Sequence, residues 1–372
     1  MEGEKRDKHM MEIQRTSSLP HDLIIEVLSR VPPKSLSRFR CVSKQWYLLL
    51  THDHEFIVRH SKWSKKNPLL LTRRYILDEN CETSKTKATV ELTSVNLDGN
   101  VTDKFKIVID GLIQTFISCG PLSLICCNYS LYICNPSFHE LVRVPYHSRI
   151  FLQNVGIGYV PSSSEYKIVH LFEAPRLGDR NMVCEVLTFT HTGKISFGSW
   201  RGCRDCPWSA CTEKSPLCVH GNIYWARSSG RKERSILSLD LEKEDFSIIN
   251  YPSCDFKTYS FLEFTGIKES LFVVGCSAET STMDVWLLHK DEKSWVLEHR
   301  ISLFPFAVNF LISSDNQSDE ILIHTEQKGL IGYNLSNQTS RRIKYFEGVR
   351  SYNKPCLYHY SISPLCITTY DQ

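Results

Sequence analysis

Hydrophobic positions along the 372-residue chain follow two different periods, and the change between them falls near Pro68. Before it, apolar residues recur at i, i+1, i+4, i+5 and i+8, which marks one face of a helix: Leu23, Ile24, Val27, Leu28 and Val31. After it, short runs of β-branched and aromatic residues alternate with polar turns. The pattern predicts a small all-α segment followed by a much larger all-β domain.

Proline and serine residues delimit the predicted helices. Pro20 suits a helix start, because its missing N–H would have no partner there, and Pro32 stops that helix. A second short helix carries Leu36, and Ser43 is a plausible N-cap for a third. With a last turn after Asp53, we expect three to four short helices.

The chain divides into four predicted segments. Residues 1–15 are a run of charges with no apolar stretch behind them, so we expect a flexible N-terminus and no secretory signal. The helices occupy 16–61. Residues 62–67 form a polar linker, and the β-rich domain occupies 68–372.

The β-rich region contains a repeated unit of strand, polar turn and strand. Six copies begin, at steps of 41, 55, 50, 49 and 45 residues, at Val90, Leu131, Val186, Ile236, Val285 and Leu330. A period of about 40 to 50 residues in an all-β chain is typical of a propeller with four strands per blade. We therefore predict roughly six blades, with Leu69–Arg73 pairing Leu357–Ser361 to close the ring; a sandwich with a coincidental period is the alternative.

Composition mainly excludes some classes of protein and partner. Hydrophobic residues make up 42% and charged residues 23%, as in ordinary soluble globular proteins. The net charge of +3 gives no argument for nucleic acid or an anionic membrane as partner. No apolar stretch approaches the 18 or so residues of a membrane span, so we expect the cytosol or the nucleus. There, 15 scattered cysteines indicate buried thiols rather than disulfides.

Residues 19–46 carry a dense motif: Leu-Pro-x-Asp-Leu-Ile-x-Glu-Val-Leu-Ser-Arg-Val-Pro-x-Lys-Ser-Leu-x-Arg-Phe-Arg-Cys-Val-Ser-Lys-x-Trp. It resembles the plant F-box almost position for position, with conservative departures at Val27, Val31 and Phe39. Independently of the resemblance, so small a helical segment cannot cover its own apolar surface, and an exposed apolar patch marks a protein-interaction site.

The resemblance implies a partner, a Skp-family adaptor that connects to a cullin and a RING subunit. The positions that it implies for adaptor contact are Leu19, Pro20, Leu23, Ile24, Val27, Leu28, Leu36, Val42 and Trp46. For Val42 and Trp46, packing inside the helical segment itself is the alternative interpretation.

The remaining chain resembles the F-box-associated region of plant F-box proteins. Ser123–Cys127 precedes Tyr132–Pro136, as a Gly-Leu-x-Cys segment precedes a Tyr-Asn-Pro strand in that family. Val219–Trp225 and Ile236–Phe246 follow in the family's order. The paired glycines of a true kelch repeat are absent, so the F-box-associated region is the better match. The resemblance implies that this domain binds a target protein.

Other chemistry finds little support. Cys203, Cys206, Cys211, Cys218 and His220 fit no standard zinc spacing, and we expect neither a metal nor a cofactor. No motif for a nucleophile elbow, a phosphate-binding loop or a metalloprotease helix occurs.

Three tryptophans invite a ligand-stacking interpretation, but in a propeller such residues more often pack between blades: Trp225, Trp286 and Trp295.

Three functions remain open. The chain is expected to be a non-catalytic adaptor subunit of a cullin-based ubiquitin ligase that recruits a target. Alternatives are an adaptor-bound scaffold that does not support ubiquitination and, with less support, an enzyme or glycan-binding propeller carrying a helical segment. The target itself cannot be deduced from one sequence, because loop chemistry sets it.

Overall fold

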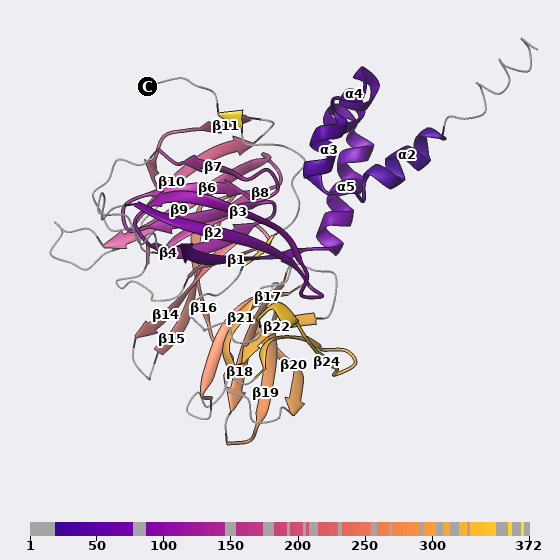
Figure 1. Ribbon diagram of the computed structural model, residues 1–372. Coiled ribbons are helices and arrows are strands. Elements are labelled where there is room, and N and C mark those ends of the chain that lie inside the picture. Colours follow the sequence, from indigo (N-terminus) through magenta and orange to yellow (C-terminus); the bar gives the residue numbers. More distant parts are fainter. Residues whose placement is uncertain are drawn as a thin grey trace, which may run out of the picture. The chain divides into compact units, whose positions relative to one another are not determined.

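A computed structural model of the chain forms two compact units, residues 1–64 and 65–372. The structure describes residues 19–76, 87–145, 154–173, 182–191, 194–203, 206–207, 215–229, 233–253, 259–267, 270–277, 279–289, 294–302, 308–312, 320–325, 328–346, 356–358 and 366–367. The predicted N-terminal segment 1–15 lies outside these residues. Figure 1 shows helices in the first unit and strands in the second.

Four helices make up the described part of the helical unit: α2 (His21–Leu28), α3 (Pro33–Phe39), α4 (Lys44–His52) and α5 (His54–Lys66). Pro20 occupies the N-cap of α2, and Pro33 begins α3. The Ser43 hydroxyl accepts a hydrogen bond from the backbone N–H of Trp46 at 3.1 Å, so the predicted cap of α4 is confirmed. The core of this unit consists of six buried side chains: Ile25, Leu28, Leu36, Leu49, Leu50 and Phe56.

Helix α5 is longer than the sequence pattern predicts. The expected linker at 62–67 is helical as far as Lys66. Phe56, His60 and Ser64 are all buried and recur at i, i+4 and i+8, which is one helix face. Two of these three residues are polar, and for that reason the hydrophobic pattern gave no sign of the last turns.

The second unit contains six antiparallel sheets, which we number as blades from inner to outer strand. Blade 1 is β25 (Cys356–Tyr358), β1 (Leu69–Ile76), β2 (Lys87–Asn96) and β3 (Val101–Asp110). Blade 2 is β4 (Ile113–Cys119), β5 (Leu122–Cys127), β6 (Leu131–Asn135) and β7 (Glu140–Arg143). Blade 3 is β8 (Val155–Val160), β9 (Glu165–Glu173) and β10 (Met182–His191), with β11 (Lys194–Phe197) and β12 (Arg201–Gly202) both along β10 and β26 (Cys366–Ile367) beside β11.

The other three blades follow the same plan. Blade 4 is β13 (Leu217–Val219), β14 (Asn222–Ser229), β15 (Glu233–Asp240) and β16 (Asp245–Asn250). Blade 5 is β17 (Phe261–Ile267), β18 (Ser270–Ser277), β19 (Thr282–His289) and β20 (Ser294–Ser302). Blade 6 is β21 (Val308–Ile312), β22 (Glu320–Thr325), β23 (Gly329–Asn334) and β24 (Ser340–Arg342), followed by the short 3₁₀ helix η2 (Lys344–Phe346).

The predicted six-bladed propeller is confirmed. Every repeat unit found in the sequence coincides with the third strand of one blade and the strand that follows it, for example Leu131 with β6 and β7. Each inner strand lies beside the inner strand of the next blade, from β25 to β4 and on to β21. The alternative sandwich is therefore excluded.

The ring closes as predicted, because the C-terminal part of the chain completes the first blade. Cys356–Tyr358 pairs antiparallel with Leu69–Leu71, and Leu70 lies opposite Leu357. Residues 359–361 of the predicted pairing lie outside the described residues. A buried cluster joins blade 6 to blade 1 at the same seam: Leu70, Val95, Ile312, Leu322, Leu330 and Ile343.

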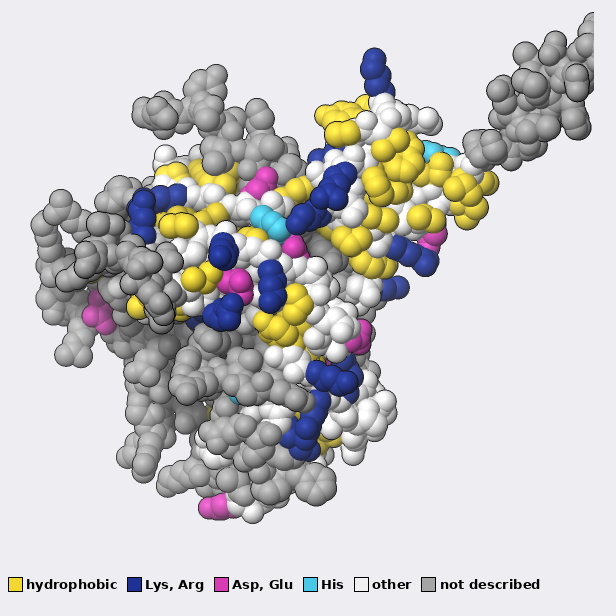
Figure 2. All heavy atoms as spheres, viewed as in Figure 1, with side chains coloured by type: hydrophobic (Ala, Val, Ile, Leu, Met, Phe, Trp, Pro, Cys, Tyr) yellow, Lys and Arg dark blue, Asp and Glu magenta, His cyan; other side chains and the backbone are white. Residues whose placement is uncertain are grey.

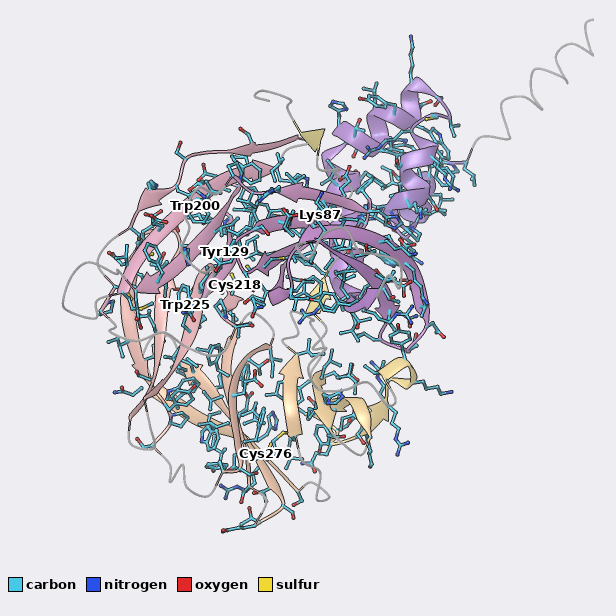
Figure 3. The ribbon with its side chains drawn as sticks, turned by 60° about the vertical axis from the view of Figure 1, so that its left-hand side comes forward. Lys87, Tyr129, Trp200, Cys218, Trp225 and Cys276 are labelled. Carbon is cyan, nitrogen blue, oxygen red and sulfur yellow. The ribbon has the colours of Figure 1, made fainter. Side chains whose placement is uncertain are left out.

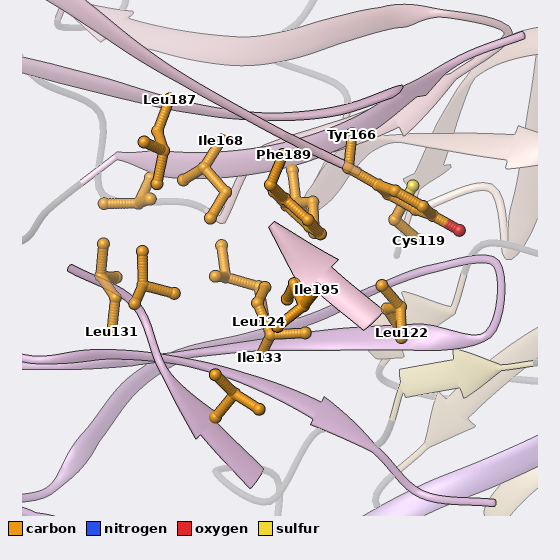
Figure 4. Close-up of a cluster of buried hydrophobic side chains, with 14 of the residues drawn as sticks. Cys119, Leu122, Leu124, Leu131, Ile133, Tyr166, Ile168, Leu187, Phe189 and Ile195 are labelled. Atoms are coloured by element: carbon orange, nitrogen blue, oxygen red, sulfur yellow. The ribbon is translucent and has the colours of Figure 1, made fainter. Parts of the chain in front are cut away.

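Hydrophobic cores fill the spaces between blades. Six clusters of buried side chains occur among the described residues, and each combines two neighbouring blades. Figure 4 shows the cluster between blades 2 and 3, where Leu124 and Ile133 face Ile168 and Phe189. Burial of this apolar surface is what holds successive blades together.

The three tryptophans pack between blades, as predicted. Trp225 is fully buried between blades 3 and 4, and its indole N–H donates to the carbonyl of Asn154 at 3.2 Å (Figure 3). Trp286 is buried between blades 4 and 5. Trp295 packs against the same cluster and donates to the carbonyl of Asn250 at 2.6 Å. These contacts account for all three side chains without a ligand.

Candidate docking surface

Helix α2 is apolar on both sides, and its two sides have different environments. Ile25 and Leu28 point into the core of the helical unit. Leu19, Leu23 and Val27 are 64%, 50% and 61% exposed. Their spacing of four residues places these three side chains along one stripe of the helix and its N-terminal extension.

The nine residues expected to contact an adaptor therefore separate into two groups. Leu28 and Leu36 are buried, and the structure assigns both to the core of the helical unit. A buried side chain has no surface to offer to a partner in this conformation. Direct contact with an adaptor stays a prediction for the other seven: Leu19, Pro20, Leu23, Ile24, Val27, Val42 and Trp46.

Val42 and Trp46, for which packing inside the helical unit was the alternative, differ from one another. Val42 is exposed in the turn before α4. Trp46 is half buried, and its ring meets the Phe39 ring edge-on with centroids 5.7 Å apart. Val42 is thus accessible to a partner. Trp46 is partly packed against Phe39 and partly exposed to solvent.

Two exposed apolar residues escaped the sequence analysis. Tyr47 and Leu48 lie on the solvent side of α4, opposite the buried Leu49 and Leu50. Four consecutive apolar residues cover both sides of a helix, so their pattern alone could not assign an outward face.

Apolar exposure is concentrated on the helical unit. Six of the thirteen exposed large hydrophobic residues among those the structure describes belong to it, although it is by far the smaller unit. Figure 2 shows hydrophobic side chains gathered over its helices. Soluble monomers rarely expose apolar surface at this density outside interaction sites.

Charged side chains hold α2 against α5. Glu26 on α2 pairs with Arg30, which lies in the turn after the helix. Arg59 on α5 lies 3.5 Å from the same Glu26 carboxylate and 2.6 Å from Glu55. Because these pairs are exposed, each adds little stability.

His60 is a buried titratable residue of the helical unit. Its Nε2 donates to the carbonyl of Val31 at 3.3 Å, and its ring lies between Phe56 and Trp63. Burial lowers the pKa of His60 to about 4, against the smaller raising effect of the hydrogen bond to Val31. The neutral imidazole therefore links α5 to the turn that follows α2 by a hydrogen bond.

This burial predicts acid sensitivity of the helical unit. The pKa of His60 is lower in the folded chain than the usual 6.5, so its stabilising contribution is complete above pH 6.5 and is lost as the pH falls to about 4. The loss should reach about 3 kcal/mol. Helical circular dichroism during thermal unfolding at pH 7 and pH 4.5 measures it. His60→Phe should show a smaller pH dependence than the wild type; equal pH dependence would contradict the assignment.

The cysteines of the candidate zinc cluster lie mainly in or beside a hydrophobic core. Cys206 is buried, and Cys203 and Cys218 pack at the edge of the cluster between blades 3 and 4. Cys211 lies outside the described residues. Among the residues that the structure describes, no three His, Cys, Asp or Glu side chains gather at metal-binding distances.

Beside these cysteines, a polar cluster fastens blade 3 to blade 4. Lys167 on β9 donates to the Leu241 carbonyl and the Glu244 carboxylate, each at 2.6 Å. Arg201 also pairs with Glu244 and is the largest cause that lowers the pKa of that carboxyl to about 2. The charges of this cluster are explained by their role in joining blades 3 and 4.

None of the described helices is long and apolar enough to cross a membrane.

Comparison with known families matches both units. The profile of the F-box domain matches residues 16–57. The profile of the F-box associated beta propeller domain matches residues 80–364. The first match contains the six exposed large hydrophobic residues that the structure describes in the helical unit, and the second covers most of the propeller.

Curated relatives are named as F-box proteins. The putative F-box protein At3g23260 of Arabidopsis thaliana is 27% identical, over 81% of this chain and 85% of its own length. The putative F-box protein At5g62660 of Arabidopsis thaliana is 26% identical, over 92% of this chain and 93% of its own. Among solved structures, a Synechocystis apocarotenoid oxygenase variant gives a TM-score of 0.45 at 7% identity, covering 75% of this chain and 78% of that one. So distant a likeness carries no information about activity.

Proposed function

Since this chain belongs to the F-box proteins that carry a C-terminal F-box-associated β-propeller domain, we propose that it is the substrate-recognition subunit of a Skp–cullin–F-box ubiquitin ligase. The helical unit docks a Skp-family adaptor, which connects to a cullin and a RING subunit. The propeller holds a target protein for ubiquitination and proteasomal degradation. We place this activity in the cytosol or the nucleus.

One observation carries the proposal: an exposed apolar stripe runs along α2 inside the matched F-box. Leu19, Leu23 and Val27 leave apolar surface in water that a partner could cover. Burying each such side chain is worth about 1.5–3 kcal/mol, which supports stable docking even after the cost of association. Similarity to F-box proteins supplies the identity of that partner.

The chain's own contribution to the reaction is proximity. Holding a target near the ubiquitin-carrying enzyme raises its effective concentration without new chemistry. A ubiquitin thioester would need an exposed and activated thiolate. Burial instead raises the pKa values of several thiols, among them Cys126, Cys127 and Cys276.

Reconstituted ubiquitination tests this division of roles. The purified chain alone should form no reducible thioester with ubiquitin, because the charged enzyme is brought by the RING subunit. Ubiquitin transfer to a bound target, or to the chain itself, should require the adaptor, the cullin and the RING subunit together. Adaptor binding with no transfer in the complete mixture would favour the scaffold alternative, and a thioester on the isolated chain would overturn the non-catalytic role.

A further inference from the structure

A second exposed apolar site lies on the propeller, at the junction of blades 1 and 2. Leu112, in the connection from β3 to β4, is 58% exposed. Tyr129, in the turn between β5 and β6, is 61% exposed (Figure 3). The two segments are adjacent, because the Ser130 hydroxyl donates to the carbonyl of Asp110 at 3.0 Å.

Hydrogen bonds between the blades make this junction rigid. The backbone N–H of Ile113 donates to the Tyr75 hydroxyl at 2.7 Å. The backbone N–H of Asp110 donates to the Tyr132 hydroxyl at 3.1 Å. Backbone that is fixed in advance loses little entropy on binding, so exposed side chains mounted on it are suitable anchors for a partner.

Among the residues that the structure describes at this junction, cations outnumber carboxylates. Lys87 lies directly opposite Asp110 in the pairing of β2 with β3, and it is exposed (Figure 3). Arg143 on β7 lies 3.1 Å from the Asp110 carboxylate and is largely exposed. Arg73, half buried, stacks over the Phe116 ring at 5.4 Å. Among the described residues, Lys87 and Arg143 thus lie beside the Asp110 carboxylate, with Arg73 on the neighbouring strand β1, and their field favours an acidic partner.

The topology makes this end of the propeller the one suited to recognition. The chain enters β1 at Leu69, whereas Lys87 and Asp110 lie at the other end of the same sheet. Connections between blades leave from the end with Asp110, and several are long, such as 144–154 and 251–260. Most turns at the opposite end are short, such as 97–100 and 241–244, although the connection 313–319 has seven residues. Binding residues of scaffold proteins concentrate on long connections.

We propose that Leu112 and Tyr129 form an anchor site of the propeller for an extended acidic segment of a target protein, with an apolar side chain between them and carboxylates toward Lys87 and Arg143. This inference rests on the proposed function in one respect, namely that the bound protein is a ubiquitination target. The binding site itself is defined by its own residues. Aromatic and arginine side chains commonly carry most of the binding energy in such sites.

Synthetic peptides test the proposal on the full-length chain. The probes are labelled 12-residue peptides with one central Trp or Leu flanked by Glu, and the same peptides flanked by Lys. Glu-flanked peptides should bind the wild type at least about tenfold more tightly than Lys-flanked ones, with affinity falling as salt rises. Fluorescence anisotropy measures both. No binding, or equal binding of both sets, overturns the proposal.

Variants then localise the site. Leu112→Ser with Tyr129→Ser should weaken the Glu-flanked peptides about tenfold or more, and Lys87→Glu should remove their advantage over Lys-flanked ones. Val101→Ser, an exposed residue at the other end of β3, is the matched control and should change nothing. Retained binding in the double variant contradicts the proposal. Adaptor binding, measured on the same samples, should be unaffected, so failure of the ligase role and failure of this site give different results.

Discussion

Replacing Trp225 with alanine is expected to lower the free energy of unfolding of the propeller by about 3–5 kcal/mol. Its side chain is fully buried in the cluster that joins blade 3 to blade 4. The substitution would leave a cavity lined by both blades and would remove the hydrogen bond to the Asn154 carbonyl. Urea unfolding of the full chain, followed by a strand signal in circular dichroism, measures the loss.

Trp295→Ala is the control for this prediction. Trp295 also joins two blades and donates a hydrogen bond to a backbone carbonyl, but it is only partly buried. Its replacement should therefore cost clearly less than that of Trp225. If the Trp225 ring instead served to stack on a ligand, Trp225→Ala would leave the stability nearly unchanged. That result would contradict packing between blades.

The number and order of the blades could be predicted from sequence because one part of each blade has a clear local pattern. In the repeat that starts at Ile236, alternating apolar residues lead to a polar turn and a second strand, which the structure shows as β15 and β16. Inner strands such as β13, with three residues, are too short to give a periodic signal. The repeat was therefore visible only through its two outer strands.

The end of the helical segment could not be predicted, because burial there does not follow hydrophobicity. His60 and Ser64 are polar and yet buried in α5. The hydrogen bond of His60 to Val31 makes its burial possible, and that contact spans 29 positions in the sequence. Long-range partners of this kind are invisible to a local pattern.

The sequence predicted most of the residues that make up the docking surface, but not which of their side chains face solvent. On α2, Ile24, Ile25, Val27 and Leu28 are adjacent, so helical spacing alone cannot distinguish the inner from the outer side. Burial in the folded helical unit decides it, with Leu28 inside and Val27 outside. The anchor site on the propeller could not be predicted from sequence, since its two residues lie in segments of separate blades that only the fold brings side by side.

The largest expected effect on function comes from Leu23→Glu combined with Val27→Lys. The two new side chains are four residues apart in the favourable order, so they should support α2 while removing its apolar stripe. Loss of two buried apolar contacts corresponds to about 3–6 kcal/mol, or more than about a hundredfold in affinity for the adaptor. Helical content and the melting temperature should stay close to those of the wild type.

A control with equal chemistry lies on the propeller. The control is Ile248→Glu with Val296→Lys, on the outer strands of blades 4 and 5. These two apolar side chains are 49% and 46% exposed, compared with 50% and 61% for Leu23 and Val27. These changes leave the matched F-box intact, so binding to the adaptor should persist.

Isothermal titration of the purified full chain with a purified Skp-family adaptor tests the central claim most directly. We expect saturable binding at one adaptor per chain for the wild type and for the Ile248→Glu, Val296→Lys control, and no measurable heat for Leu23→Glu, Val27→Lys. Equal affinity in all three proteins, or no binding by the wild type, would contradict that claim.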